Sequence, residues 1–524
     1  MPMQLPSSCA AALVGLAILA ATPSVRANNI TTSAGSLVDD NGSQVYVQFD
    51  VTWENSWRTS FEPNNWDAAW IFVKYRTADG LWHHASLNRT GHTAPIGSTI
   101  ATGLVDPASP YNVFTNPGVG VFLHAGGEGS GTFAVNGVQL QWEHNADVTG
   151  LWEVEEVRVF AIEMVYVPQG AFAAGTGGTE SNAFTLTTID TGMATAAPGG
   201  TGGLGGEAGG YPTGQTAPAN ASWPNGFNAF YCMKYEVSQQ GYVDFLNTLT
   251  YAQQVARTTS ATAPNSAAGS GALSATNSNR NGIDIQTPGT ASTVPAVYAC
   301  NLNGDATFGD PTDGQDIACN YLGWDDLTAY LDWSGLRPMT ELEFEKACRG
   351  TMAPVGDEFP WGTADIADVA YSVPNNGANN EFISAGYSTV SGNASYDVTD
   401  GAIDGPLRVG IFAANASNNG RLSAGASYYG IMELGGNVWE RTVSIGSDNG
   451  RTYTGTHGNG LLEADGQSNV ATWPAPTTAN GAGFRGGAWL LPAPYIRVSD
   501  RSLAGTSGVG PAPHDGGRGA RLAP

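Results

Sequence analysis

Basic side chains are scarce in this sequence. Its 524 residues include 21 Lys and Arg against 46 Asp and Glu, which gives a net charge of −25 at pH 7. A chain with this excess of negative charge is not attracted to phosphate backbones or to anionic lipid headgroups. We therefore expect no nucleic acid among its partners.

Long apolar runs are rare too, and a single one stands out at the start of the chain. Residues 10–21 are apolar at all twelve positions, which is too short for a stable membrane span. The segment Val25-Arg26-Ala27 ends in the small residues that a signal peptidase accepts. We interpret residues 1–27 as a signal peptide cleaved near Ala27. The mature protein is expected to be secreted, extracellular or at the cell surface, with no integral membrane segment.

Cysteine is also sparse, with five residues in the whole chain. Cys9 belongs to the predicted signal peptide, and four cysteines remain, which allow three disulfide pairings. Cys300 and Cys319 bracket a polar, Asp-rich loop, so we expect a local disulfide between them. Cys232 and Cys348 would then form the second pair. The alternative is that all four are free buried thiols.

Residues 28–163 show the period-two alternation of apolar and polar side chains that is typical of β-strands. The pattern is clearest at residues 45–53, 69–75 and 154–162, with Gly, Asn and Pro between these runs. Several short strands joined by turns predict an antiparallel β-sandwich domain. Its tryptophans are expected to fill the core rather than to stack on sugars. They are Trp53, Trp57, Trp66 and Trp70.

Residues 164–524 combine short helices with Gly-rich loops. Ser238 is a good N-cap for one helix, and residues 340–343 form a capping box at the start of another. Two tracts of biased composition, near 173–222 and 258–293, contain too few apolar residues to fold alone and are expected to be insertions. The whole chain is therefore predicted to be α+β, with a β-sandwich followed by an irregular, loop-rich domain.

Six short motifs follow one another along this second domain. They lie at residues 164–172, 230–238, 337–350, 359–362, 430–440 and 484–489. The most distinctive is Gly-Ile-Met-Glu-Leu-Gly-Gly-Asn-Val-Trp-Glu at residues 430–440. In type and order the six resemble the motifs of the formylglycine-generating enzyme family, also called the sulfatase-modifying factor family. The resemblance covers residues 164–524 and implies the family's loop-rich variant of the C-type lectin-like fold.

Catalytic members of that family oxidise a substrate cysteine with copper held by two cysteines. The resemblance places these two positions at Leu491 and Ile496. Neither side chain offers the thiolate that cuprous copper requires. The resemblance therefore implies the family's scaffold without its copper chemistry, and we expect copper to be absent.

The same resemblance implies calcium as a cofactor. The family's second calcium site corresponds here to Glu433, Gly436, Val438 and Glu440, which offer carboxylate and carbonyl oxygens. Oxygen atoms are the ligands that this hard cation prefers. Asp404 is assigned to a first calcium site. The alternative is that Glu440 accepts backbone hydrogen bonds and that no metal is bound.

The resemblance also implies a ligand-facing surface in the last part of the chain. Five residues there are expected to be exposed, and their mixture of aromatic and polar groups suits a sugar or a peptide. They are Tyr495, Arg497, Asp500, Arg501 and His514. A solvated loop without a ligand is the alternative.

These observations predict a secreted or surface protein that is similar to the formylglycine-generating enzyme but does not catalyse its reaction. It would bind a glycan or a protein, or assemble with copies of itself. The alternative is a metal-dependent oxidase of the same family that uses an unrecognised site, for which His457 and His514 are the candidate ligands.

Overall fold

The computed structural model describes residues 30–40, 44–102, 118–193, 217–259, 262–274, 277–508 and 510–524. The signal peptide predicted at residues 1–27 lies outside these ranges, as does the middle of the tract near 173–222. No helix within the described ranges is long and apolar enough to cross a bilayer.

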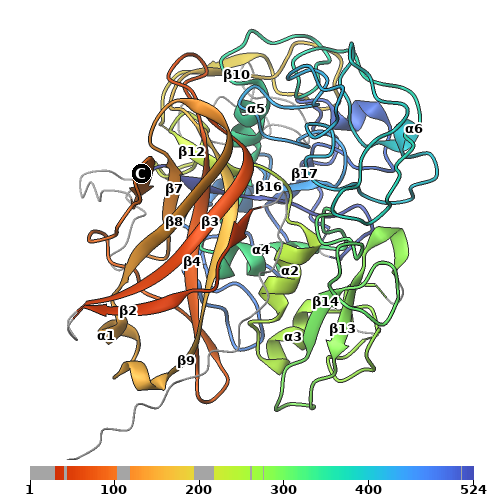
Figure 1. Cartoon of the computed structure of the whole chain (residues 1–524). Helices are drawn as coiled ribbons and strands as arrows, with labels where there is room; N and C mark the ends of the chain where they lie inside the picture. Colours follow the sequence, from red (N-terminus) through yellow and green to blue (C-terminus); the bar gives the residue numbers. More distant parts are fainter. Residues whose placement is uncertain are drawn as a thin grey trace, which may run out of the picture.

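The N-terminal part is a β-sandwich, drawn in red and orange in Figure 1. One sheet is antiparallel and contains β1 (Thr31–Thr32), β2 (Ser36–Asp40), β3 (Gln44–Arg58) and β8 (Gly129–Trp142). The facing strands are β4 (Asp67–Thr77), β5 (Trp82–His84), β6 (Ser98–Ala101), β7 (Val121–Ala125) and β9 (Val154–Val167). A short helix α1 (His144–Asp147) and the 3-10 turn η2 (Leu151–Glu153) connect β8 to β9. Alternate residues of β3 are buried, as the period-two pattern predicts.

The second sheet continues beyond the sandwich into the C-terminal part. Strand β9 pairs with β4 along one edge and with β12 (Phe230–Met233) along the other, and the sheet then continues through four more strands. These are β18 (Gly519–Leu522), β15 (Arg337–Thr340), β16 (Glu440–Val443) and β17 (Ala482–Arg485). All pairs in this sheet are antiparallel except β15 with β16. The domain boundary expected between residues 163 and 164 falls inside β9, so both parts of the chain share one sheet of ten strands.

Strand β4 separates two apolar cores. Ala69 and Ile71 face the first sheet of the sandwich, whereas Trp70 and Phe72 face the helices of the C-terminal part. Successive side chains of a strand point to opposite faces, so a continuous apolar run can fill a core on each side. The prediction that the tryptophans fill the sandwich core is confirmed for Trp53, but Trp70 fills the other core.

Short helices and long loops make up most of the C-terminal part. The helices are α2 (Gln239–Leu246), α3 (Tyr251–Arg257), α4 (Trp324–Trp333), α5 (Glu341–Arg349), α6 (Asp397–Asp400) and α7 (Asp448–Arg451), with 3-10 turns η4 (Ser278–Arg280) and η5 (Ala493–Ile496). Two hairpins pair β10 (Phe172–Ala174) with β11 (Thr187–Ile189), and β13 (Ile283–Thr287) with β14 (Val297–Cys300). Both predicted helix starts are confirmed. Ser238 Oγ accepts from Gly241 N at 3.1 Å, and Thr340 and Glu343 form the capping box. The predicted α+β class is confirmed.

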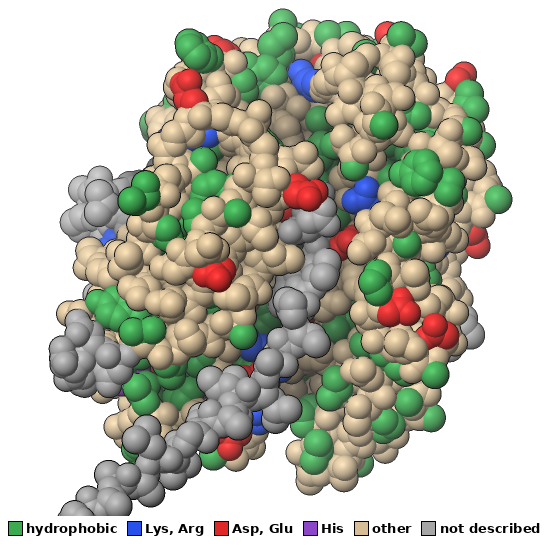
Figure 2. Space-filling view, viewed as in Figure 1, with side chains coloured by type: hydrophobic (Ala, Val, Ile, Leu, Met, Phe, Trp, Pro, Cys, Tyr) green, Lys and Arg blue, Asp and Glu red, His purple; other side chains and the backbone are tan. Residues whose placement is uncertain are grey.

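Charged side chains are widely separated on the face shown in Figure 2, where single red and blue groups lie among tan and green. Many other charged side chains are buried, and most of these belong to the C-terminal part. The negative charge of the chain therefore does not gather into one patch on this face.

The disulfide prediction is wrong. Cys232, Cys300, Cys319 and Cys348 are all free, buried thiols. Cys300 and Cys319 do share one apolar cluster, and Cys232 and Cys348 share another, so the members of each predicted pair are in the same core. There they fill space as small apolar side chains.

Candidate functional site

The motif at residues 430–440 forms a tight turn that leads into β16. Glu433, Gly436 and Asn437 all have positive φ angles, of 49°, 86° and 64°. At Gly436 a Cβ would lie 2.3 Å from the carbonyl oxygen of Ser395, so only glycine fits there. The Asn437 side chain fixes the turn, since its Oδ1 accepts from Leu407 N at 2.7 Å. The motif thus places two carboxylates, at Glu433 and Glu440, on a rigid backbone.

The buried guanidinium of Arg518 lies near these two carboxylates and that of Glu236, and its charge acts on all three. Arg518 Nε donates to Glu440 Oε1, and its Nη2 donates to the carbonyl of Glu433 at 3.0 Å. Glu236 Oε1 accepts from Val438 N at 3.0 Å, and its Oε2 accepts from the Asn437 amide at 2.7 Å. Three carboxylates therefore lie near one guanidinium in the interior.

Burial disfavours the charged forms of all three acids. It raises the pKa of Glu433 to about 7 and also raises the pKa of Glu440, although Arg518 opposes both shifts. For Glu236, burial and then the neighbouring carboxylates raise the pKa well above its ordinary value. The Oε2 atoms of Glu433 and Glu440 are buried and accept no hydrogen bond from any described residue. A cation would favour the charged forms of these acids and would satisfy both oxygens.

The residues predicted to bind calcium fit that cation in charge and in ligand type, with one exception. Asp404 lies on an exposed turn, where it accepts from the Asn279 amide at 3.4 Å. Within the described ranges no three His, Cys, Asp or Glu side chains form a group that could hold a metal ion. A calcium ion at the turn would therefore need the backbone carbonyls of Gly436 and Val438 in addition to carboxylates.

Glu236 is the residue of this cluster that the sequence reasoning did not single out. It lies in the motif at residues 230–238, but nothing in that motif alone relates it to residues 430–440. Its two hydrogen bonds to the turn span about two hundred residues of sequence. Its place in one of the six motifs, two residues before the helix cap Ser238, was the available signal.

The two positions assigned to copper ligands are occupied by packed apolar side chains. Ile496 is fully buried in a cluster with Phe359, Trp361, Ala394 and Tyr396. Leu491 is partly buried and packs against a second cluster, which is formed by Trp439, Phe484 and Ala488. Neither position offers a ligand atom for a soft metal ion.

The five predicted ligand-binding residues do not form one exposed surface. Tyr495 and His514 both lie at Trp439: the Tyr495 ring is 6.1 Å from the Trp439 ring, and Trp439 N donates to the His514 carbonyl at 2.8 Å. Both side chains are partly exposed. Arg497 is also partly exposed, but it pairs with Asp357 at 3.1 Å.

The expectation that Asp500 and Arg501 are exposed is wrong. Arg501 is fully buried, where it pairs with Glu341 at 2.7 Å and lies 3.5 Å from the centre of the Phe184 ring. Asp500 is 5% exposed and accepts from the hydroxyl of Ser502 at 2.6 Å. Both residues therefore hold loops of the C-terminal part in place.

The two histidines considered for an unrecognised oxidase site lie in different surroundings. His457 is buried and its Nε2 accepts from Leu522 N at 3.0 Å. His514 is partly exposed and its Nδ1 lies 3.0 Å from Asp515. Neither belongs to a group of three potential metal ligands within the described part of the chain.

Comparison with known proteins relates most of the chain to one family. Residues 153–521 match the family model of the sulfatase-modifying factor enzyme 1-like domain. Among solved structures, Treponema denticola variable protein 1 matches with a TM-score of 0.29 and 12% identity, over 69% of this chain and 96% of that protein. A TM-score this low adds nothing to the family match. No curated protein matches the sequence.

Proposed function

The chain belongs to the sulfatase-modifying factor enzyme 1-like family, and we propose that this member is a secreted or surface protein that binds or assembles without catalysing an oxidation. The observation that carries the proposal is the packing of Leu491 and Ile496. At the positions of the family's copper ligands, these side chains fill apolar clusters where an oxidase would need two thiolates.

The remaining thiols support the same conclusion. All four described cysteines are buried, and burial raises the pKa of Cys232 to about 12. Burial also raises the pKa of Cys300, Cys319 and Cys348 well above the ordinary value. Because the thiolate is the form that binds copper, these residues are poorly suited to replace the missing ligands.

The test is a direct assay for oxidation. Purified protein is supplied with cuprous copper and oxygen, and a cysteine-containing peptide is followed by mass spectrometry. We expect no conversion to formylglycine, and elemental analysis of the native protein should find no stoichiometric transition metal. Conversion of the peptide that is lost when His457 or His514 is substituted would instead establish the alternative, an oxidase with a different metal site.

We further propose that calcium binds at the turn of residues 430–440. Glu433 and Glu440 would hold it through their carboxylates, and Gly436 and Val438 through their carbonyls. When bound, the ion would supply the positive charge that Arg518 alone does not provide. The support is the pair of buried Oε2 atoms without hydrogen-bond partners.

Calcium binding predicts a stability that depends on the ion. Chelation should lower the melting temperature by a few degrees, because a ligand at about 100 times its Kd stabilises the native state by about 2.7 kcal/mol.

In the variant Glu433→Gln the response of the melting temperature to calcium should disappear. The melting temperature in chelator should stay close to that of the wild type, since the amide can still accept from Gly410 N. The exposed Glu463 provides the control Glu463→Gln, which should respond as the wild type does. An unchanged wild-type melt in chelator would exclude this site.

For the partner, we propose a glycan or a protein that contacts the partly exposed Tyr495 and His514 beside Trp439. The support is that aromatic and polar groups lie together there at the surface. A glycan array probed with the wild type and with Tyr495→Ala tests this surface. Binding that survives the substitution would place the site elsewhere. Polymers that grow with protein concentration would instead indicate self-assembly.

A further inference from the structure

The chain contains three lysines, and all three are buried. Lys74 and Lys346 donate to backbone carbonyls at 2.8 and 3.0 Å, whereas Lys234 contacts two carboxylates. In the other buried ion pairs of the described residues the cation is an arginine. An arginine stays protonated, but a lysine that loses a proton becomes a nucleophile. Lys234 therefore differs in its chemistry from the cations of those pairs.

Three neighbouring strands bring one amine and two carboxyl groups together at Lys234. Its Nζ lies 3.3 Å from Oδ2 of Asp67, the first residue of β4, and 2.9 Å from Oε2 of Glu163 on β9. Lys234 directly follows β12, and the three strands are adjacent in the shared sheet in the order β4, β9, β12. The side chains of Lys234, Asp67 and Glu163 are 3%, 0% and 2% exposed. The three groups are thus in contact and shielded from bulk water.

Asp67 is held in one orientation by donors to both of its oxygens. Its Oδ1 accepts from Ser56 Oγ at 2.7 Å and from Trp57 N at 3.1 Å. Its Oδ2 accepts from Trp53 Nε1 at 3.0 Å. Such fixed donors stabilise the negative charge that develops on a carboxyl oxygen when a nucleophile attacks the carbon. The structure therefore positions the carbon Cγ of Asp67 beside the nitrogen of Lys234.

Lys234 begins as an ammonium group in this ion pair. Burial acts to lower the pKa of Lys234, but Glu163, Tyr235 and Asp67 together raise the pKa above its ordinary value. Transfer of one proton from Nζ to Oδ2 of Asp67 leaves the net charge unchanged. It also removes two charges from the interior, where charged groups are costly. A neutral amine then lies against a neutral carboxyl group, with the carboxylate of Glu163 in contact with the amine.

We propose that Lys234 and Asp67 join in an intramolecular amide bond. Nζ attacks Cγ of Asp67, and the bond between Cγ and Oδ2 breaks. Both protons of the leaving water come from Nζ. One passes directly to Oδ2, and the other passes through the carboxylate of Glu163, which ends unchanged. One ammonium and one carboxylate thus become one amide and one water, without an oxidant or any other reagent.

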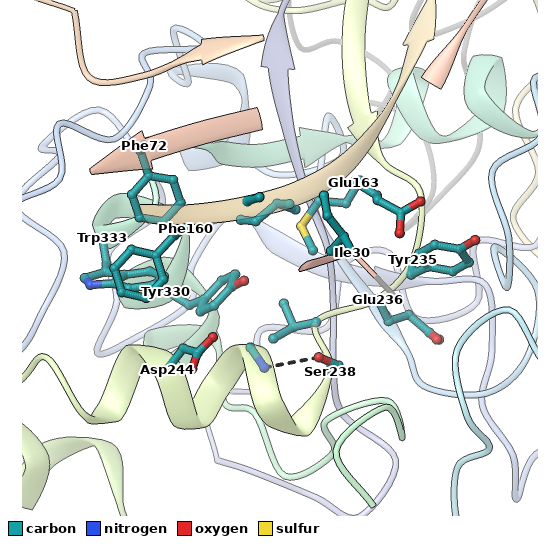
Figure 3. A pocket seen from close by; sticks show the side chains of 15 residues that line it. Ile30, Phe72, Phe160, Glu163, Tyr235, Glu236, Ser238, Asp244, Tyr330 and Trp333 are labelled. Carbon is teal, nitrogen blue, oxygen red and sulfur yellow. Dashed lines mark hydrogen bonds between the residues drawn. The ribbon is translucent and has the colours of Figure 1, made fainter. Parts of the chain in front are cut away.

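The released water has room beside the reacting groups. Glu163 and Tyr235 line a pocket between the sandwich and helices α2 and α4. Figure 3 shows both residues at the opposite end of this pocket from the ring of Trp333. The centre of a water molecule can occupy about 50 Å³ of the pocket, which is more than one water requires. The water can therefore leave the bond without crossing a packed core.

The bond fastens the sandwich to the rest of the chain. Asp67 precedes the family match at residues 153–521, and Lys234 lies inside it. An amide between them closes a long loop and constrains the unfolded chain, as a disulfide does. The four described cysteines form no disulfide, so this amide supplies a covalent cross-link that they do not. The proposal is independent of the calcium turn and of the surface at Tyr495.

Mass spectrometry of the purified full-length protein tests the bond. The denatured wild type should be one water molecule lighter than its sequence requires, counted from the N-terminal residue that the spectrum identifies. Trypsin should not cleave after Lys234, and residues 59–74 should be recovered joined to residues 159–257. A wild type of full mass that trypsin cleaves after Lys234 would overturn the proposal.

Lys234→Arg is the matched variant for the nucleophile. It keeps a cation beside Asp67 and Glu163, but the guanidinium stays protonated and does not attack a carboxyl group. This variant should have its full mass, and residues 59–74 should be recovered as a free peptide. Loss of one water in Lys234→Arg as well would place the dehydration at another residue and refute the assignment.

Glu163→Gln tests the transfer of the second proton. The amide oxygen can still accept from Nζ and Lys234 keeps Asp67 as its counter-ion, but the amide cannot take up the proton. The bond should form at least about 100-fold more slowly, so freshly purified Glu163→Gln should be largely unlinked and should lose water over time. The exposed Glu155 on the same strand gives the control Glu155→Gln, which should be linked as the wild type is. Near-ultraviolet circular dichroism checks that both variants are folded. Complete linkage in fresh Glu163→Gln would exclude Glu163 from the proton transfer.

Discussion

The two parts of this chain are stabilised in opposite ways. The sandwich encloses an apolar cluster between two sheets, and its ion pairs are at the surface, as in Arg76 with Glu155, whose side chains are 33% and 46% exposed. The C-terminal part buries ion pairs in its interior instead. They include Arg337 with Glu343, Arg349 with Glu358, Arg441 with Asp515, Arg485 and Arg501 with Glu341, and Arg518 with Glu440.

The difference follows from how each part satisfies its backbone. Strands of the sandwich pair with one another, so apolar side chains can fill the space between the sheets. Loops leave carbonyl groups without such partners, and a guanidinium can bind several of them together with a carboxylate. Arg485 binds two glutamates and the carbonyl of Val498, and Arg518 binds Glu440 and three backbone carbonyls. Buried arginine thus connects loops where regular pairing is absent.

The two modes of stabilisation meet at Lys234. This residue follows β12 and is fully surrounded by protein. Its ammonium contacts Asp67 of β4 at 3.3 Å and Glu163 of β9 at 2.9 Å. A buried charge of the C-terminal part is therefore neutralised by strands of the shared sheet, which joins the two parts electrostatically as well as by backbone pairing.

The largest effect should come from neutralising the centre of the buried network. Glu341→Gln leaves Arg485 and Arg501 in the interior without their shared carboxylate. Removing one partner of a buried pair costs about 3–5 kcal/mol, because the remaining charge stays desolvated. Urea unfolding of the variant should show this loss of unfolding free energy.

The exposed Glu463 gives the matched control, since Glu463→Gln removes a carboxylate of the same kind from the surface. Its unfolding free energy should stay within about 0.5 kcal/mol of the wild type. If the two glutamine variants were equally stable, the buried pairs would not stabilise the C-terminal part, and the contrast between the two parts would fail.

In the sandwich the corresponding test is a substitution that creates a cavity. Leu123 of β7 is fully buried in the cluster between the sheets. Leu123→Ala should lower the unfolding free energy by about 2–5 kcal/mol through lost burial and the cavity that remains. Leu37 of β2 is 37% exposed, and Leu37→Ala should cost clearly less. A small loss at Leu123, equal to that at Leu37, would mean that apolar packing does not hold the sandwich.

The same contrast explains what the sequence could predict about the fold. Period-two alternation predicted the sandwich correctly, and local chemistry predicted the helix starts at Ser238 and Thr340. The shared sheet was not predicted, because the pairing of β9 with β12 joins segments about sixty residues apart. Alternation shows which face of a strand is apolar but does not identify its neighbour.

Prediction was weakest for charged residues of the candidate site. Arg501 and Asp500 were expected at the surface, since charged side chains are seldom buried without a partner. The partner of Arg501 is Glu341, one hundred and sixty residues away, and no local pattern relates the two. Six ordered motifs were enough to identify the family, whereas the pairing of buried charges depends on the folded loops.

An intermediate effect on the unfolding free energy is expected at Lys346, a buried lysine that forms no ion pair with a described carboxylate. Lys346 is fully buried, and its Nζ donates to the carbonyl of Phe227 at 3.0 Å. Burial lowers the pKa of Lys346 to about 7, although Glu343 opposes the shift. Between pH 7 and the unfolded pKa near 10.4, the unfolded chain holds more protons, so the free-energy cost of burying Lys346 falls as the pH rises.

The variant Lys346→Met isolates this contribution. The stability of the wild type relative to the variant should increase from pH 7 to pH 9, by at most about 1.4 kcal/mol per pH unit. Thermal melts of both proteins at the two pH values measure it. A difference that stays constant with pH would show that Lys346 keeps an ordinary pKa and is stabilised as the paired cations are.

The smallest effect should come from the surface pair of the sandwich. Arg76→Met removes the contacts to Glu155 and Glu156 at 3.1 and 3.2 Å. Because both sides of the pair are hydrated, the loss should be below about 1 kcal/mol and should shrink further in about 1 M salt, where the Debye length is about 3 Å. The loss in Glu341→Gln should hardly depend on salt, because ions do not reach the buried network. Equal salt dependence in the two variants would mean that water enters the C-terminal network, and the two parts would then be stabilised by the same kind of ion pair.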